Sequence, residues 1–300
     1  MIIGVLGSSG FVGANLVRFL SEKMDVIEIS LREEGWRDKI ASTDILINLI
    51  GKAHDHDELS SESEYENVNV NLIKEIYEVF ARSKNKALIH FSSIAVVEEF
   101  HRNEILTEEE LCAPKSWYAI SKKKAEQWLE IQQEKDNKKV IILRPPMIHG
   151  EGDKGNLTLL YKLISKGIPY PLAAYENSRS FIAMPNLLFF MWQIILKHEK
   201  LESGIYHVAD DQCLSTKEVI KIIKEVSGKN GIEIAIPKIV IRALAKFGDV
   251  IKLPLNTKRL KKMTGSMVVS NDKIKLALEI DHLPFTAKDG LILTIRSFSE

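Results

Sequence analysis

Apolar runs and amphipathic stretches alternate along the first half of the chain. Five apolar runs have the length of buried strands, at residues 2–6, 26–29, 45–50, 87–91 and 140–143. Three stretches between them repeat their apolar positions every three or four residues, as helices do, at residues 11–20, 70–81 and 115–131. Strands that alternate with helices form parallel sheets covered on both faces. The pattern therefore predicts an α/β fold, a doubly wound parallel sheet of the Rossmann type.

The regular alternation is lost after residue 150. Helical patterns dominate from there on, and one further strand is expected over residues 204–208, where it should return to the sheet. The apolar run at 187–196 is shorter than the roughly 20 residues that cross a bilayer, so it predicts a buried helix. We expect a dinucleotide-binding Rossmann domain over residues 1–150, completed by the returning strand, and a smaller, mostly helical, C-terminal substrate-binding part over residues 151–300.

The composition is that of an ordinary globular protein. The 300 residues are 45% hydrophobic and 27% charged, and the 41 basic residues equal the 41 acidic ones. A zero net charge argues against broad attraction to nucleic acid or to an anionic membrane, although a local basic pocket would not show in the total. Cys112 and Cys213 are far apart and outside any metal-ligand spacing, so we expect reduced thiols and no metal site. Without a signal-peptide pattern at the first residues, we expect a cytoplasmic protein with no stable membrane insertion.

A glycine-rich turn follows the first predicted strand and opens the first helix. Gly7 permits a tight turn, Gly10 lets the backbone approach a pyrophosphate, and Gly13 allows close packing of the helix. The phosphates would then meet free amides at the positive end of the helix. The alternative is a glycine turn with a packing role only. The residues assigned to a nicotinamide dinucleotide here are Gly7, Ser9, Gly10, Phe11, Val12 and Gly13.

The end of the second predicted strand bears on the choice between NAD and NADP. An NAD enzyme usually has an acidic residue there, which holds the ribose hydroxyls. Ser30 takes that place in this sequence, and Glu28 shares its side of the strand. Arg32 could bind a ribose phosphate, which would favour NADP, or could be an ordinary surface arginine. The cofactor is therefore expected to be NAD or NADP.

Three residues form a candidate catalytic group. Tyr118 and Lys122 are four residues apart on a predicted helix, so they share a face. An ammonium group beside a phenol is expected to lower the pKa of Tyr118 and to make it an acid or base at neutral pH. Ser93 follows a central strand, at the sheet edge where ligands of such folds bind, and could hydrogen-bond the same substrate oxygen. Its neighbour Ser92 is expected only to cap the end of the strand.

Together these motifs resemble the extended short-chain dehydrogenases/reductases, in the branch formed by the NAD-dependent epimerase/dehydratase family of nucleotide-sugar enzymes. The segments that carry the resemblance span the chain, at residues 6–13, 48–51, 69–71, 91–93, 118–122, 143–150, 156–157, 179–182 and 265–266. Segments 52–54 and 92–96 are similar to the shorter UDP-glucose 4-epimerase-like subgroup. The resemblance implies catalytic roles for Ser93, Tyr118 and Lys122, and a homodimer.

The resemblance also implies which other residues meet the ligands. Further cofactor contacts are implied for Leu49, Ile50, Gly51, Asn69 and Pro145, together with Tyr118 and Lys122. Substrate contacts are implied for Lys52, Ser93, Asn156 and Arg179. For Lys52, and for His54 in the same segment, solvation at the surface is the alternative. His149 is expected to pack in the crossover and not to act as a base.

Some positions depart from the pattern of the family. A dehydratase usually has an Asp-Glu pair directly after its catalytic serine or threonine, and here Ile94 and Ala95 stand in these places. Neither side chain can move a proton, so dehydration is disfavoured. Met147 replaces an asparagine of many members, which weakens one implied contact to the substrate phosphate. The short stretch before residue 45 lacks the strand whose acidic residue commonly meets adenine.

The resemblance leads to three functional hypotheses. The first is a UDP-hexose 4-epimerase that transfers a hydride at sugar carbon 4 through a 4-keto intermediate. The second is a UDP-4-keto-6-deoxy-hexosamine 4-reductase of surface polysaccharide biosynthesis, which would use the same residues. The third is a non-catalytic protein that senses the cofactor, although such proteins typically lose the tyrosine or its lysine.

The stretch 239–252 combines apolar and basic residues. We expect it to form an amphipathic helix that covers the substrate region, and contact with a membrane is the alternative.

Overall fold

The computed structural model describes residues 1–53, 60–136, 138–167, 170, 172, 174–228, 236–251 and 256–298. His54, for which a role near the substrate was considered, lies outside the described residues.

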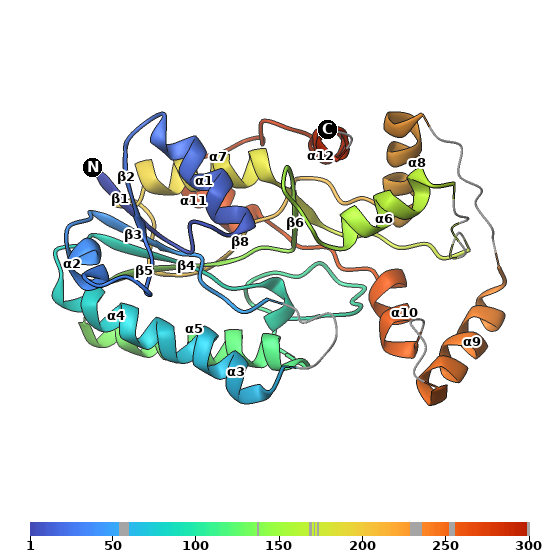
Figure 1. Ribbon diagram of the computed structural model, residues 1–300, viewed down its shortest axis with the longest axis horizontal. Coiled ribbons are helices and arrows are strands. Elements are labelled where there is room, and N and C mark those ends of the chain that lie inside the picture. Colours follow the sequence, from blue (N-terminus) through green and yellow to red (C-terminus); the bar gives the residue numbers. More distant parts are fainter. Residues whose placement is uncertain are drawn as a thin grey trace.

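Six parallel strands form the central sheet (Figure 1). Their order is β2 (Asp25–Ile29), β1 (Ile2–Leu6), β3 (Ile45–Asn48), β4 (Ala87–Phe91), β5 (Lys139–Arg144) and β8 (Gly204–His207). The chain moves from β1 outward to β2 and then returns past β1 to β3, so the strand order reverses at β1. Ligands of open α/β sheets bind where the order reverses. The doubly wound Rossmann-type fold predicted from the alternating pattern is confirmed.

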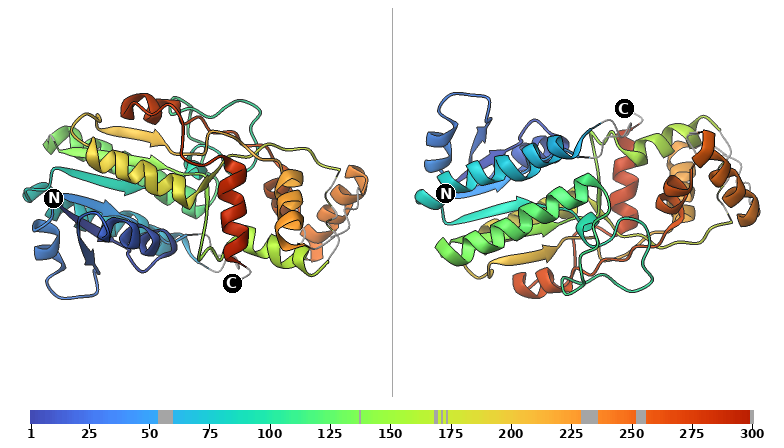
Figure 2. Two further views of the ribbon diagram at one scale, coloured as in Figure 1. Left: turned by 90° about the horizontal axis from the view of Figure 1, so that it is seen from above. Right: turned by 90° about the horizontal axis from the view of Figure 1, so that it is seen from below.

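Each face of the sheet is covered by its own set of helices (Figures 1 and 2). Alternate residues of a strand point to opposite faces, so Ile45 and Ile47 of β3 join one apolar core and Leu46 joins the other. The first core contains residues of α1 (Phe11–Ser21), α7 (Met184–Leu196) and α11 (Asp272–Leu278). The second contains residues of α2 (Trp36–Ala41), α4 (Leu72–Arg82) and α5 (Trp117–Asp136). Burial on both faces explains why these strands are continuous apolar runs.

Several predicted elements differ in their bounds by a few residues; the helix expected over 115–131, for example, is Trp117–Asp136. Two of the differences bear on the site. The strand expected over 45–50 ends at Asn48, because the side chain of Asn48 accepts a hydrogen bond of 3.0 Å from the amide of Ile50 and turns the chain. The helix expected over 70–81 is α4, which is preceded by α3 (Glu62–Glu66) and by a π-helical turn, Asn67–Asn71. Such wide turns inside helices are frequent at functional sites.

The C-terminal part also contains a small parallel sheet that the sequence pattern did not predict. β6 (Met147–His149) pairs with β7 (Phe181–Ala183), and three-residue strands are too short to show a pattern of their own. The helices of this part are α6 (Asn156–Ser165), α8 (Thr216–Ser227), α9 (Lys238–Ile251), α10 (Thr257–Thr264) and α12 (Ala287–Ser297). These helices lie together beyond one end of the central sheet (Figure 2), and most of their buried apolar residues form a third core.

Two expectations for this part are confirmed. His149 is buried and its Nδ1 lies 2.8 Å from the hydroxyl of Thr294, while burial lowers the pKa of His149 to about 4. It packs in the crossover, as predicted. The run at 187–196 belongs to the buried helix α7. Within the part of the chain that the structure describes, no helix is both long and apolar enough to cross a membrane.

Candidate active site

The glycine turn joins β1 to α1 at the carboxyl edge of the sheet. Gly7 has a φ of 81°, in the left-handed region that favours glycine. A Cβ atom on Gly13 would collide with the carbonyl oxygen of Gly7, so only glycine lets the helix pack against the turn. α1 begins after Gly10 without a side-chain cap and without an acidic residue in its first turn. Its unpaired N–H groups and its positive end therefore suit the phosphates of a dinucleotide.

The loop after β6 lies against this turn. The amide of Asn15 donates hydrogen bonds to the carbonyl oxygens of Phe11, at 2.9 Å, and Glu151, at 3.1 Å. The carboxylate of Glu151 also pairs with Arg18 at 2.9 Å. A Cβ atom on Gly152 would lie 3.8 Å from the ring of Phe11. The chain therefore leaves the sheet for its C-terminal part directly beside the start of α1.

β2 ends next to the glycine turn. Leu6 is opposite Ile29 in the sheet register, so the residues that follow the two strands leave the sheet side by side. The hydroxyl of Ser30 accepts a hydrogen bond of 3.3 Å from the amide of Arg32, and the side chain of Arg32 is exposed. An exposed arginine at this edge is accessible to a ribose or to its phosphate. In the turn itself Ser9 is exposed, while Phe11 and Val12 pack on the first core.

The three predicted catalytic residues meet at the carboxyl end of β4. Lys122 is buried, and its Nζ donates a hydrogen bond of 2.8 Å to the carbonyl oxygen of Phe91, the last residue of β4. Tyr118, one helical turn earlier on α5, is hydrogen-bonded through its side chain to that of Ser93. The ring of Tyr65 lies edge-on to Tyr118, with 6.5 Å between the ring centres. The cluster therefore lies at the edge of the sheet that also carries the glycine turn.

The electrostatics of this cluster differ from the expectation. Burial lowers the pKa of Lys122 to about 8, and the nearby charge of Glu126 only partly opposes this. Burial also raises the pKa of Tyr118; the hydrogen bond with Ser93 acts against the rise, and the charge of Glu99 adds to it. The prediction that Lys122 lowers the pKa of Tyr118 is wrong for this arrangement. The loss of water around the phenol is the largest cause of the rise, and Lys122 is not among the groups that shift this pKa.

The loop after β3 packs against Lys122. A Cβ atom on Gly51 would come within 2.8 Å of the Nζ of Lys122, so glycine leaves room for the ammonium group. Asn69, in the π-helical turn, is buried; its side chain accepts from the amide of Lys52 at 2.8 Å and donates to the hydroxyl of Ser121 at 2.9 Å. The side chain of Asn69 thus ties this loop to α5.

The remaining positions implied for the cofactor also follow strands. Leu49 and Ile50 are partly buried directly after β3. Pro145 is buried directly after β5, and its carbonyl oxygen accepts a hydrogen bond of 3.0 Å from the amide of Ile94. All of them lie at the carboxyl ends of neighbouring parallel strands, which is the ligand-binding edge of such sheets.

A buried ion pair links α5 to β5, and the sequence interpretation missed it. The carboxylate of Glu126 accepts from the guanidinium of Arg144 at 2.7 and 2.8 Å and from the hydroxyl of Ser92 at 2.6 Å. All three side chains are almost fully buried. Ser92 was expected to cap the strand end, but it is Ser93 that caps the short helical turn after β4. The sequence did offer one indication of Glu126, because this residue is four positions beyond Lys122 and therefore lies on the same face of the predicted helix.

The residues implied for the substrate are not joined to one another. Lys52 forms a surface ion pair with Glu64 at 3.3 Å. Asn156 is exposed at the start of α6. Arg179 donates a hydrogen bond of 2.5 Å to the carbonyl oxygen of Lys262 in α10, and burial lowers its pKa. Among the described residues no hydrogen bond or ion pair connects these three side chains.

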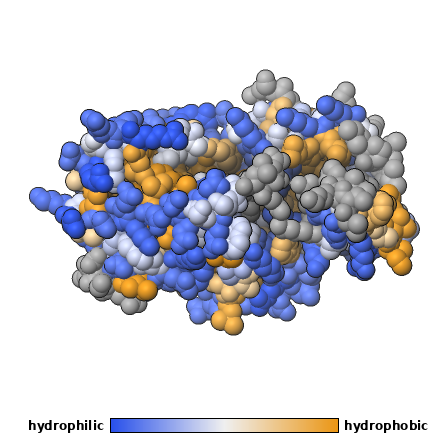
Figure 3. All heavy atoms as spheres, turned by 60° about the horizontal axis from the view of Figure 1, so that its bottom comes forward, coloured by the Kyte–Doolittle hydropathy of each residue, from blue (hydrophilic) through white to orange (hydrophobic). Residues whose placement is uncertain are grey.

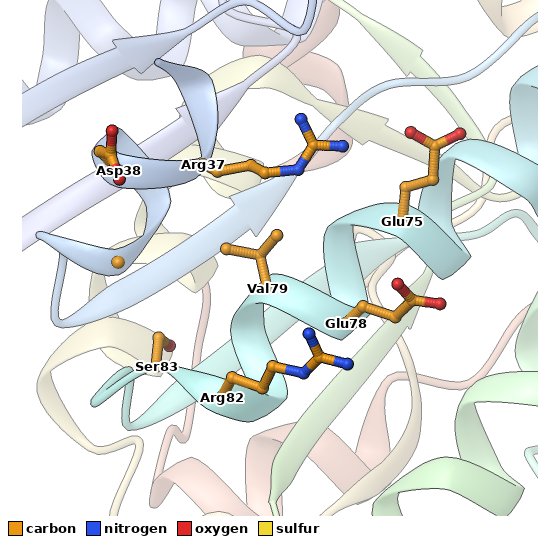
Figure 4. A pocket seen from close by; sticks show the side chains of 8 residues that line it. Arg37, Asp38, Glu75, Glu78, Val79, Arg82 and Ser83 are labelled. Atoms are coloured by element: carbon orange, nitrogen blue, oxygen red, sulfur yellow. The ribbon is translucent and has the colours of Figure 1, made fainter.

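A shallow pocket lies on a different part of the surface, between α2 and α4 (Figure 4). Its lining residues are Arg37, Asp38, Ala41, Glu75, Glu78, Val79, Arg82 and Ser83. None of the residues predicted for the cofactor, the substrate or catalysis is among them. The pocket is therefore separate from the sheet edge that carries the glycine turn and the end of β4.

A glycine turn at the reversal point of a doubly wound parallel sheet defines a dinucleotide-binding α/β protein. The chain belongs to the NAD dependent epimerase/dehydratase family, whose sequence pattern matches residues 3–209. The family resemblance inferred from the motifs is thereby confirmed. Because the family is NAD-dependent, the expected class of cofactor, a nicotinamide dinucleotide, is confirmed as well.

Two curated relatives are similar to this chain in sequence. A UDP-glucose 4-epimerase of Vibrio cholerae is 29% identical over 97% of this chain and 94% of its own length. An N-acetyl-alpha-D-glucosaminyl-diphospho-ditrans,octacis-undecaprenol 4-epimerase of Escherichia coli O157:H7 is 24% identical over 75% of this chain and 72% of its own length.

Solved structures share the fold along the whole chain. UDP-glucuronic acid 4-epimerase from Bacillus cereus in complex with NAD has a TM-score of 0.77 at 14% identity, covering 100% of this chain and 99% of that one. RMD from Pseudomonas aeruginosa complexed with NADPH also has a TM-score of 0.77, at 15% identity, covering 100% of both chains. At such identities the likeness extends to the fold and not to the substrate.

Proposed function

We propose that this protein is a sugar-nucleotide 4-epimerase that acts on a UDP-hexose. The observation that carries the proposal is the convergence of Ser93, Tyr118 and Lys122 at the carboxyl end of β4, on the same sheet edge as the glycine turn. The similarity to a UDP-glucose 4-epimerase over nearly the whole length of both chains supports the choice of an epimerase. The aliphatic side chains of Ile94 and Ala95, which cannot eliminate water, argue against a dehydratase.

The residues around the glycine turn fit the cofactor that the family implies. The N-terminus of α1 offers free amides to its phosphates, and Gly7 and Gly13 keep the turn tight beneath them. Ser30 and Arg32 are placed to meet the adenosine ribose of NAD or NADP. When bound, the oxidised nicotinamide would supply a positive charge and would take up a hydride from sugar carbon 4, which would return to the opposite face after the keto sugar has turned.

The chain's own residues manage the proton of the sugar hydroxyl. Tyr118 removes it from the oxygen on carbon 4 as the hydride leaves, and returns it after the keto sugar has turned. Ser93, already hydrogen-bonded to Tyr118, orients the same oxygen. Lys122, with its pKa of about 8, is mainly charged at neutral pH and stabilises the phenolate. Because burial raises the pKa of Tyr118, this added positive charge is needed for Tyr118 to act as a base.

We assign residues 151–300 to the sugar nucleotide, together with Lys52 from the nucleotide-binding half. Arg179 would approach the diphosphate from the segment before β7, and Asn156 would approach the nucleotide from the start of α6. The loop that carries Glu151 and Gly152 packs on α1, so the two ligands would lie on either side of it.

The replacement Tyr118→Phe tests the proposal. It removes only the hydroxyl that would transfer the proton, so turnover of UDP-glucose or UDP-galactose should fall by at least about 100-fold. The matched control is Tyr65→Phe, which removes a hydroxyl from the neighbouring ring and should retain most of the activity. Near wild-type activity of Tyr118→Phe would reject the catalytic assignment, and an inactive wild type that still binds the cofactor would favour the cofactor-sensing hypothesis.

Cofactor stoichiometry distinguishes an epimerase from a 4-keto reductase. An epimerase completes many turnovers on bound cofactor and consumes none, whereas a reductase consumes one reduced cofactor for each product. Absorbance at the reduced nicotinamide band, followed together with product formation, therefore separates the two. Consumption of one reduced cofactor per product would reject the epimerase hypothesis and support the hypothesis of a 4-keto reductase of surface polysaccharide biosynthesis.

A sugar diphosphate carried on a polyprenol is a second candidate substrate. The relative from Escherichia coli O157:H7 is named for such a substrate. The observation that favours it here is an exposed apolar and basic surface on α9, in the part of the chain assigned to the substrate. Conversion of a short-chain polyprenyl-diphospho-sugar in the same epimerase assay would test it, and a protein active only on the UDP-sugar would exclude it.

A further inference from the structure

Several apolar side chains of helix α9 are exposed to solvent and are not covered by other parts of the described chain. Ile241 and Ala245 of this helix are buried and join the C-terminal core. Four larger apolar residues are exposed, Ile239 at 77%, Val240 at 44%, Leu244 at 48% and Phe247 at 58%. Figure 3 shows hydrophobic atoms gathered at this end of the molecule. The stretch does form the expected amphipathic helix, but its apolar residues divide between the core and the surface.

The spacing of the residues gives α9 three distinct faces. Val240, Leu244 and Phe247 are separated by four and three residues, so they lie in one row along the helix. Lys238, Arg242 and Lys246 follow one another at intervals of four and form a second row. At 3.6 residues per turn, the apolar row lies on one side of the buried face and the basic row on the other, and the exposed Ile239 lies between the two rows on the solvent side.

The charge of this region differs from that of the rest of the chain. Between residues 237 and 264, which include α9 and α10, the sequence has eight basic residues and one acidic residue. The rest of the chain consequently has 33 basic and 40 acidic residues. The single acid, Asp249, accepts hydrogen bonds from the amide and the hydroxyl of Thr257, at 2.8 and 2.5 Å. The zero net charge of the protein thus hides a concentrated basic surface.

We propose that α9, together with Lys261 and Lys262 of α10, docks on the surface of an anionic lipid bilayer. A helix with exposed Leu, Ile and Phe beside a row of Lys and Arg lies in the plane of the membrane interface, with its apolar side chains among the headgroups. Each basic residue near an anionic surface adds about 1 kcal/mol of attraction. This inference does not rest on the proposed epimerase activity.

The observations favour a membrane over a second copy of the chain. Two copies paired through α9 would bring two strongly basic regions together, and like charges in an interface are repulsive. Four partly exposed side chains on one helix also fall short of the roughly 800 Å² that each partner buries in a typical stable interface. A bilayer has the opposite charge and needs only a shallow apolar contact.

The docked surface would lie next to the predicted substrate region. Arg179 donates a hydrogen bond to the carbonyl oxygen of Lys262 in α10. The hydroxyl of Tyr175 donates a hydrogen bond of 3.4 Å to the carbonyl oxygen of Lys238 in α9. α9 and α10 are therefore attached to the segment before β7. A substrate held at a membrane surface would thus be presented on the side of the molecule that carries Arg179.

Vesicle co-sedimentation of the full-length protein tests the inference. We expect binding to vesicles of phosphatidylcholine and phosphatidylglycerol in equal parts, and little binding to phosphatidylcholine alone. High salt should weaken the binding, because it screens the basic row. The variant Phe247→Trp should show a blue shift of its fluorescence with the anionic vesicles. Equal affinity for both kinds of vesicle, or for neither, would overturn the inference.

Surface variants separate this role from folding and from catalysis. Arg242→Gln with Lys246→Gln should weaken vesicle binding about 25-fold, and Leu244→Ser with Phe247→Ser at least about tenfold. Leu276→Ser, at an 84% exposed apolar position on α11, is the matched control and should bind like the wild type. The melting temperature and the affinity for the nicotinamide dinucleotide, whose proposed site lies in the other half of the chain, should stay unchanged in every variant. Unchanged vesicle binding, or a loss of self-association measured by light scattering, would refute membrane docking.

Discussion

Replacing Lys122 by methionine should stabilise the folded protein while it removes activity. Lys122 is only 4% exposed, and burial lowers its pKa from 10.5 to about 8. At 1.36 kcal/mol per pKa unit, keeping the ammonium charged in the folded state costs about 3 kcal/mol at neutral pH. Methionine has a similar length and no charge, but it gives up the hydrogen bond to the carbonyl oxygen of Phe91, worth about 1 kcal/mol. The expected net gain in the free energy of unfolding is about 2 kcal/mol.

The pH dependence makes this prediction specific. Since the pKa of Lys122 is lowered in the folded protein, the unfolded chain binds more protons between pH 8 and 10.5, and wild-type stability rises across this range. The methionine variant lacks this contribution. Urea unfolding of cofactor-free protein at pH 7 and at pH 10 should therefore show an advantage for Lys122→Met at pH 7 that shrinks or reverses at pH 10.

A neighbouring lysine provides the control. Lys124 lies on the same helix but is 41% exposed and pairs with Glu62 and Glu66 at the surface. Lys124→Met should be neutral or destabilising by less than about 1 kcal/mol, with no gain at pH 7. A Lys122→Met protein that is less stable than the wild type at pH 7, or whose difference does not change with pH, would refute the reasoning that burial of the charge dominates.

Three other substitutions test the supporting elements. Gly13→Ala should impair both folding and cofactor binding, because the added Cβ would collide with the carbonyl oxygen of Gly7. In Gly10→Ala the added Cβ would lie 3.4 Å from its nearest neighbour, so this variant should lose cofactor affinity and keep its melting temperature. Equal melting temperatures of the two variants would contradict this expectation. Glu126→Gln leaves the buried charge of Arg144 unpaired and should cost about 3–5 kcal/mol in urea unfolding, and a loss below about 1 kcal/mol would show that the ion pair is dispensable. Arg32→Ala should raise the Kd of NADP far more than that of NAD if the guanidinium meets the ribose phosphate, and equal effects on the two in a titration would reject that role.

The sequence predicted the strands and helices of the first half because their apolar pattern has a direct physical cause. Strands buried on both faces must be apolar at nearly every position, as in Ile45–Asn48 and Ala87–Phe91. The glycine spacing predicted the turn, since Gly13 lies where any Cβ would collide. The helical period placed Tyr118 and Lys122 on one face. Each of these features depends on residues close together in sequence.

The tertiary structure decided what depends on distant residues. The side chain of Asn69 is oriented by a π-helical turn and by Lys52 and Ser121, and no local pattern predicts such a turn. Glu126 and Arg144 are 18 residues apart in sequence, and their ion pair forms because the packing of α5 on β5 brings them together. Burial raised the pKa of Tyr118, which was expected to be lowered, and it divided the apolar residues of α9 between core and surface. Burial is set by the packing of the whole chain, so no spacing along the sequence determines it.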